Sequence, residues 1–223
     1  RPPRSTLFPY TTLFRSLLYN HARTFGGSGL FYAVKMIERA LADLDKSKDA
    51  ALWARAQNNL AIALGNLGDR QSGEEGIARI NDAVTAHHKA LEVWTKDSAS
   101  KHWAMTQNNL GNALRTLGER QGGEDAIARM NEAITAYHKA LEVRTKDSAP
   151  MEWAMTQENM AIVYVERAAF FDGEQDQTKA KADLEQAVFH VDTALSVYDP
   201  VHTPYNHDTS AALRERIQSA LNA

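Results

Sequence analysis

Asparagine side chains recur at a fixed spacing, and their chemistry suits recognition or structural bonding. Asn59, Asn109 and Asn159 are separated by intervals of fifty residues, and Asn58 and Asn108 precede two of them. An asparagine amide offers both hydrogen-bond donors and an acceptor, so a row of amides can pair with a polypeptide backbone whatever its side chains. The same amides can instead bond neighbouring helices or cap turns, because repeated chains also repeat their structural residues. Both uses remain open at this stage.

Side chains that could support catalysis or metal binding do not recur at a comparable fixed spacing. The chain has no cysteine, and no nucleophile, phosphate-loop or zinc-protease motif occurs in it. His87 and His88 are neighbours, so on a helix they face different directions, whereas metal ligands need spacings of three or four. Gly26 to Gly29 form a glycine-rich stretch with no preceding strand and no following lysine, and we interpret it as a turn. We therefore expect no enzyme activity, no metal and no cofactor.

Composition narrows the class of partner. The formal net charge is -3 and the pI is about 6.3, which gives no basic surface for nucleic acid. No run approaches the roughly 18 apolar residues of a membrane helix, so no membrane span is expected. We expect a cytoplasmic protein, although a lack of cysteine suits any compartment.

A fifty-residue period organises most of the chain. Trp53, Trp103 and Trp153 mark it, and residues 51–100 and 101–150 agree at about 32 of 50 positions. The period divides residues 17–198 into a partial unit (17–50) and full units at 51–100, 101–150 and 151–198, with four extra residues near 171–178. The tryptophans are expected to pack between units, because each ring buries a large apolar area.

Each half-unit is expected to be a helix. Apolar residues fall three and four apart in both halves of the middle unit, as on one face of a helix, and no run alternates as a strand does. Gly118 stands where a left-handed helix C-cap is expected, and Pro150 stands where the next helix begins. Gly111 and Ala133 should let paired helices approach closely. The predicted fold class is all-α.

The two ends of the chain differ from the repeats. Thr6 to Ser16 reads TLFPYTTLFRS, which resembles the conceptual translation of a sequencing adapter, so residues 1–16 are interpreted as a non-native leader. A divergent leader or a poor signal peptide are the alternatives. Residues 199–223 are expected to form a linker and a polar C-terminal capping helix, from about Thr209 to Leu221.

The repeat pattern resembles the tetratricopeptide repeat. The pattern is carried by Leu110, Gly111, Leu114 and Gly118 in the first half and by Ala133, Tyr137, Ala140 and Leu141 in the second. The segment W-A-x-T-Q-N-N-L-G-x-A-L is similar to bacterial tetratricopeptide proteins with extended units, and N-N-L-[AG] also resembles kinesin light chain. The unit is longer than the usual 34 or so residues, and Ala61 and Ala161 replace a common glycine.

This resemblance implies a right-handed superhelix of antiparallel helix pairs whose concave groove is lined by the first helix of each pair. Such grooves bind extended or helical peptides of partner proteins. An arginine in such a groove could select partner peptides that carry carboxylates. The candidate groove residues are Arg55, Asn58, Asn59, Asn108, Asn109, Asn112, Arg115 and Asn159.

Two functions remain open on this basis. The first is a protein-interaction scaffold. The alternative is a sensor or regulatory segment of a larger signalling enzyme, with its effector domain upstream of Leu17. The helix that carries Phe31, Val34, Ile37 and Leu41 would lack its pair partner, so we expect fraying or self-association there.

Overall fold

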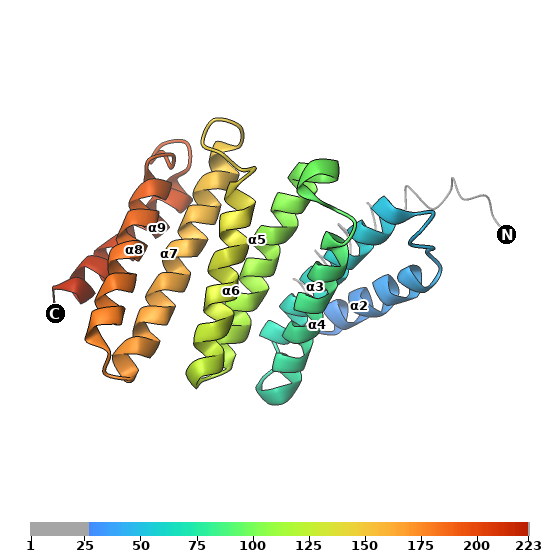
Figure 1. Ribbon diagram of the computed structural model, residues 1–223, viewed down its shortest axis with the longest axis horizontal. Coiled ribbons are helices and arrows are strands. Elements are labelled where there is room, and N and C mark those ends of the chain that lie inside the picture. Colours follow the sequence, from blue (N-terminus) through green and yellow to red (C-terminus); the bar gives the residue numbers. More distant parts are fainter. Residues whose placement is uncertain (1–26, 223) are drawn as a thin grey trace. The chain divides into compact units, whose positions relative to one another are not determined.

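The computed structural model describes residues 27–222, and all regular secondary structure in that range is helical (Figure 1). The whole of the proposed leader, residues 1–16 with the adapter-like segment, lies outside the described residues. The helices are α2 (Gly27–Ala42), α3 (Ala50–Asp69), α4 (Gly73–Leu91), α5 (Lys96–Arg120), α6 (Gly123–Leu141), α7 (Pro150–Gly173), α8 (Gln177–Leu195) and α9 (Pro204–Leu221). The all-α prediction is confirmed for this part of the chain.

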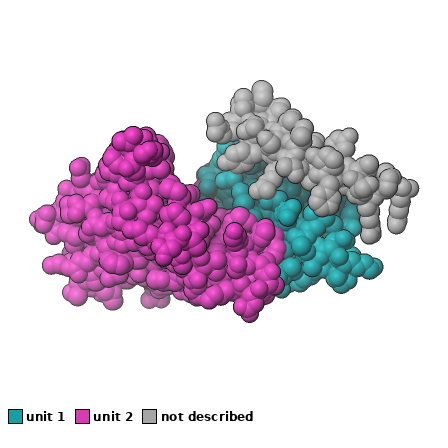
Figure 2. Space-filling view, turned by 90° about the horizontal axis from the view of Figure 1, so that it is seen from above, with its two compact units in different colours: residues 1–93 teal, residues 94–223 magenta. Residues whose placement is uncertain are grey.

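Consecutive helices pack in pairs: α3 with α4, α5 with α6, and α7 with α8. Short connections reverse the chain within each pair (Figure 1). The chain divides into two compact units, residues 1–93 and residues 94–223, which are coloured separately in Figure 2. Each unit is described by itself below.

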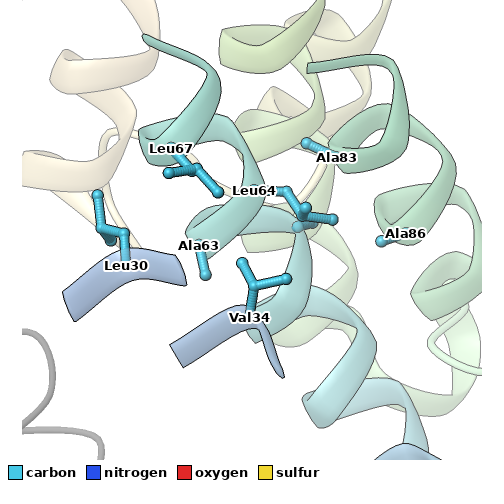
Figure 3. Packing of buried hydrophobic residues seen from close by; sticks show 8 residues of the cluster. Leu30, Val34, Ala63, Leu64, Leu67, Ala83 and Ala86 are labelled. Atoms are coloured by element: carbon cyan, nitrogen blue, oxygen red, sulfur yellow. The ribbon is translucent and has the colours of Figure 1, made fainter. Parts of the chain in front are cut away.

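The first unit contains α2, α3 and α4. Its core is a cluster in which Leu30 and Val34 of α2 meet Leu64 and Leu67 of α3 (Figure 3). Ala83 of α4 completes the cluster from the other side of α3. The alanine side chains at these contacts are small, so the two helix axes can lie close together.

The second unit contains α5 to α9. In addition to the two pairs, α6 contacts α7 and α8 contacts α9. Met130, Tyr137, Met160 and Val191 are fully buried, and Ile217 anchors α9 at 1% exposure. The C-terminal helix α9 therefore packs on the last pair.

Three boundaries differ from the sequence-based expectations. Gly118 is not a left-handed C-cap: α5 continues to Arg120, and Gly118 is buried inside the helix. The left-handed backbone lies instead at Gly123, with φ 60°. Gly118 is required for close packing, because a Cβ there would lie 3.0 Å from the Ala126 carbonyl oxygen.

The other two boundaries lie at the chain's ends. α2 begins at Gly27, so the glycine-rich stretch contributes to a helix rather than a turn. α9 begins at Pro204, five residues earlier than expected, because proline is favoured in the first helical turn. Pro150 occupies the same position in α7, as predicted.

Candidate functional site

The structure places all eight candidate residues on first helices of pairs. Arg55, Asn58 and Asn59 lie on α3 in the first unit, and the remaining five lie on α5 and α7 in the second. The second unit brings its five residues onto two helices that contact each other. The site is therefore built here from α5 and α7.

Asn108 connects α5 to α7 through a buried polar cluster. Its Oδ1 atom accepts hydrogen bonds from Thr156 Oγ1 at 3.1 Å and from Asn159 Nδ2 at 3.4 Å. Arg144 Nη1 in turn donates to Thr156 Oγ1 at 3.1 Å. Thr156 is fully buried and Asn108 is 9% exposed, so an unpaired amide at this position would carry a desolvation cost. Asn108 and Asn159 thus have a structural bond in addition to any contact with a ligand.

Asn112 and Arg115 join α5 to the two following helices. The Tyr137 hydroxyl of α6 donates to Asn112 Oδ1 at 2.7 Å. Arg115 pairs with Glu166 of α7 at 2.5 Å and also with Glu119 of its own helix. The pairing leaves Arg115 engaged with two carboxylates of this chain, so its charge is compensated before any partner binds.

Glu166 has an unusual environment for a carboxylate. The pKa of Glu166 is raised to about 8, chiefly by burial and also by a hydrogen bond with Glu119, although the nearby Arg115 guanidinium opposes both. One guanidinium therefore faces two carboxyl groups, and the folded protein favours a proton on that pair. We therefore expect the stability of the α5–α7 contact to depend on pH.

Asn59 and Asn109 differ from the other asparagines. Both side chains are half-buried, and neither has a side-chain hydrogen-bond partner among the described residues. Asn58 is buried and already interacts within the chain, and Arg55 is exposed. The amides with unused donors and acceptors are thus the second asparagine of each Asn-Asn pair.

Methionine accompanies the asparagines, which sequence reasoning missed. Met105 and Met155 lie four residues before Asn109 and Asn159, and Met155 is 48% exposed. Residues four and seven apart share one helix face. We define the amide–methionine stripe as Met105, Asn109 and Asn112 of α5 with Met155 and Asn159 of α7. Its sequence signal was the recurrence of methionine at the fifty-residue period.

The tryptophans have a mixed environment. Trp53, Trp103 and Trp153 are half-buried rather than fully enclosed. Lys46 lies 4.7 Å from the Trp53 ring centroid, and Lys146 lies 5.8 Å from that of Trp153, which are cation–π distances. Both lysines lie in the connections between pairs.

The fully enclosed tryptophan is one outside the repeat pattern. Trp94 is 4% exposed and packs on His102 with ring centroids 4.7 Å apart.

The third pair carries buried polar contacts of its own. Arg167 donates to both carboxylate oxygens of Asp183, at 2.7 and 2.6 Å, and Asp183 is 5% exposed. His190 Nδ1 lies 2.6 Å from Gln157 Oε1, and burial lowers the pKa of His190 to about 4. Such bidentate and buried contacts fix geometry. A position-by-position comparison of the repeat units in the sequence could have revealed these polar residues.

Residues 27–222 contain no cluster of three or more side chains that could together hold a metal ion. No helix in this range combines the length and apolar character needed to cross a bilayer. One open hollow of about 460 Å³ lies along α8, lined by Gln177, Thr178, Lys181, Ala182 and Glu185, away from the stripe.

Comparison with known proteins gave no assignment. No protein-family model matches the chain, and no curated protein is significantly similar to it. Function is therefore inferred from the helices and their side chains.

Proposed function

We propose that this chain is a protein-interaction scaffold that binds a partner peptide along the first helices of its repeats. In this proposal the helix pairs continue as a right-handed superhelix of the tetratricopeptide kind, with the first helices on its concave face. The repeated sequence and the three helix pairs support the proposal. It assigns the chain no catalytic step.

One observation carries the proposal: the amide–methionine stripe combines unused hydrogen-bonding capacity with exposed apolar surface. Asn109 is half-buried with no side-chain partner in the described region, and Met155 is 48% exposed. An amide can bond a peptide backbone in either sense, and a thioether adapts to side chains of different shape. Together these groups favour a peptide recognised mainly through its backbone.

The surrounding contacts would hold this stripe in place. Asn108 bonds across to Thr156, and Arg115 pairs with Glu166, so α5 and α7 are linked at two levels. Preorganised helices lose little conformational freedom when a partner binds, which favours affinity. Asn108 and Arg115 therefore support the surface, whereas Asn109 and Met155 are proposed to touch the peptide.

Selection from a displayed library of random peptides tests the proposal. Peptides enriched on the chain should bind Asn109→Ala about tenfold more weakly, the loss of roughly one hydrogen bond. Met155→Gln should weaken them similarly. Neither change should shift the melting temperature appreciably, since neither residue is fully buried.

Two controls make the result specific. Phe189→Gln removes a 62%-exposed apolar side chain from the second helix α8 and should leave peptide affinity unchanged. Asn108→Ala should lower the melting temperature, because it removes the acceptor that Thr156 and Asn159 of α7 share on α5. The proposal fails if no peptide is enriched, or if enriched peptides bind the Asn109 and Met155 variants as tightly as the parent chain.

A further inference from the structure

Helix α2 corresponds to the second helix of a pair. Ala33, Ala40 and Leu41 precede Ala83, Ala90 and Leu91 of α4 by fifty residues. α2 also packs on the following helix α3, as α6 packs on α7. Leu30 and Val34 make that contact and are 5% and 2% exposed (Figure 3). The side of α2 that faces α3 is therefore covered.

On the other side of α2, Ala33 is 9% exposed, but further along the helix the side chains are uncovered where their equivalents are closed. In the three full pairs the alanine equivalent to Ala40 is 0% exposed, because the first helix of the pair covers it; these residues are Ala90, Ala140 and Ala194. In α2, Ala40 is exposed. Met36 is 45% exposed, although its equivalents Ala86 and Ala136 are buried.

We propose that the face formed by Met36 and Ala40, with the half-buried Ile37 beside it, binds a helix of the α3 sequence type, just as the first helix of each full pair covers the equivalent face of the second. The inference rests on the repeated pair contact and does not depend on peptide binding by the stripe.

The pair contacts define the chemistry of that helix. Tyr137 is opposite Gly111, where a Cβ would lie 2.5 Å from the ring. At the equivalent positions, buried His87 accompanies Ala61 and buried Val191 accompanies Ala161. Ile37 is a branched aliphatic residue similar in shape to Val191, so the incoming helix should present alanine there. α3 itself has this residue.

A synthetic peptide with the sequence of residues 50–71 tests the assignment when added to the full chain. A helix of this length is marginal alone, so its helical circular dichroism signal should rise on binding. Amide exchange across residues 33–42 should slow at least tenfold at saturation. A control peptide with Ala61→Glu should do neither, because a carboxylate would be buried against Ile37.

Two variants of the chain locate the contact. Ala40→Glu should abolish peptide binding and leave the melting temperature unchanged, since Ala40 is exposed. Thr85→Glu, at an exposed position of α4, should retain binding.

Two results would overturn the proposal. One is a peptide that fails to bind or binds Ala40→Glu equally. The other is a stable dimer in light scattering that Ala40→Glu converts to a monomer, which would assign the face to a second copy.

Discussion

Gly111 and Tyr137 are matched in size across the α5–α6 contact. A Cβ at residue 111 would lie 2.5 Å from Cε1 and 2.8 Å from Cδ1 of the tyrosine ring. Tyr137 is fully buried, and its hydroxyl bonds Asn112 one residue further along α5. The equivalent positions hold Ala61 with His87, and Ala161 with Val191. A larger residue on one helix thus accompanies a smaller one on the other.

Gly111→Ala should lower the free energy of unfolding by about 1–3 kcal/mol, the usual cost of overpacking a core. Adding Tyr137→Val should recover part of that loss, because the pair then matches Ala161 and Val191. Urea denaturation of both single variants and the double variant gives the coupling energy. Gly122→Ala is the control, since a Cβ there meets nothing within 4 Å. Strictly additive losses would contradict the size matching.

Arg167→Leu should destabilise the second unit by about 3–5 kcal/mol, because it leaves the buried Asp183 carboxylate without its partner. The double variant Arg167→Leu, Asp183→Arg restores the residues found at the equivalent positions, Leu117 and Arg129, and should regain much of the loss. Thermal unfolding followed by circular dichroism provides the measurement. A double variant less stable than Arg167→Leu would show that the third pair cannot accept the pattern of the second.

The raised pKa of Glu166 predicts a dependence of stability on pH. Because burial and Glu119 raise it from 4.5 to about 8, the folded state binds a proton that the unfolded state releases near pH 4.5. The associated stabilisation is complete below pH 4.5 and is lost as pH rises through about 8. The stability of the parent chain relative to Glu166→Gln should therefore decrease across this range. If the difference in urea midpoint between the parent chain and Glu166→Gln stays constant from pH 4.5 to 8, this prediction is wrong.

Two buried histidines predict the opposite trend in acid. Burial lowers the pKa of His87 to about 3, with His88 adding to the effect, and lowers that of His190 to about 4. Both are favoured as neutral rings in the folded state, so their contribution is present above pH 6.5 and is lost as pH falls toward 4. His87→Val should reduce the acid sensitivity while preserving packing beside Ala61. Equal slopes of stability against pH below 6.5 in parent and variant would contradict this.

The pairing of helices was predictable because its signals are local. Apolar spacing, the glycine-rich connection before α6 and Pro150 each act within a few residues, and the fifty-residue period repeats them. The error at Gly118 shows the limit of such signals. A glycine near a helix end can serve as a cap or as a contact, and only the position of Ala126 on the next helix distinguishes the two.

The candidate site was less predictable. Asn108 and Asn109 are identical in type and adjacent in sequence, so the pattern cannot separate them. On a helix they point about 100° apart, and the structure gives only Asn108 a partner, from a helix nearly fifty residues away. Met155 was overlooked because methionine at helical spacing is usual in a core.

The sequence by itself determined which segments are helices, where pairs begin and which positions repeat, because hydrophobic spacing and backbone preferences are properties of short segments. The tertiary structure alone decided which polar groups are already bonded. It placed Thr156 against Asn108, Glu166 against Arg115 and Asp183 against Arg167, and it left Ala40 uncovered. These outcomes depend on the rotation of each helix against its neighbour, which is set by the volumes of side chains far apart in the chain.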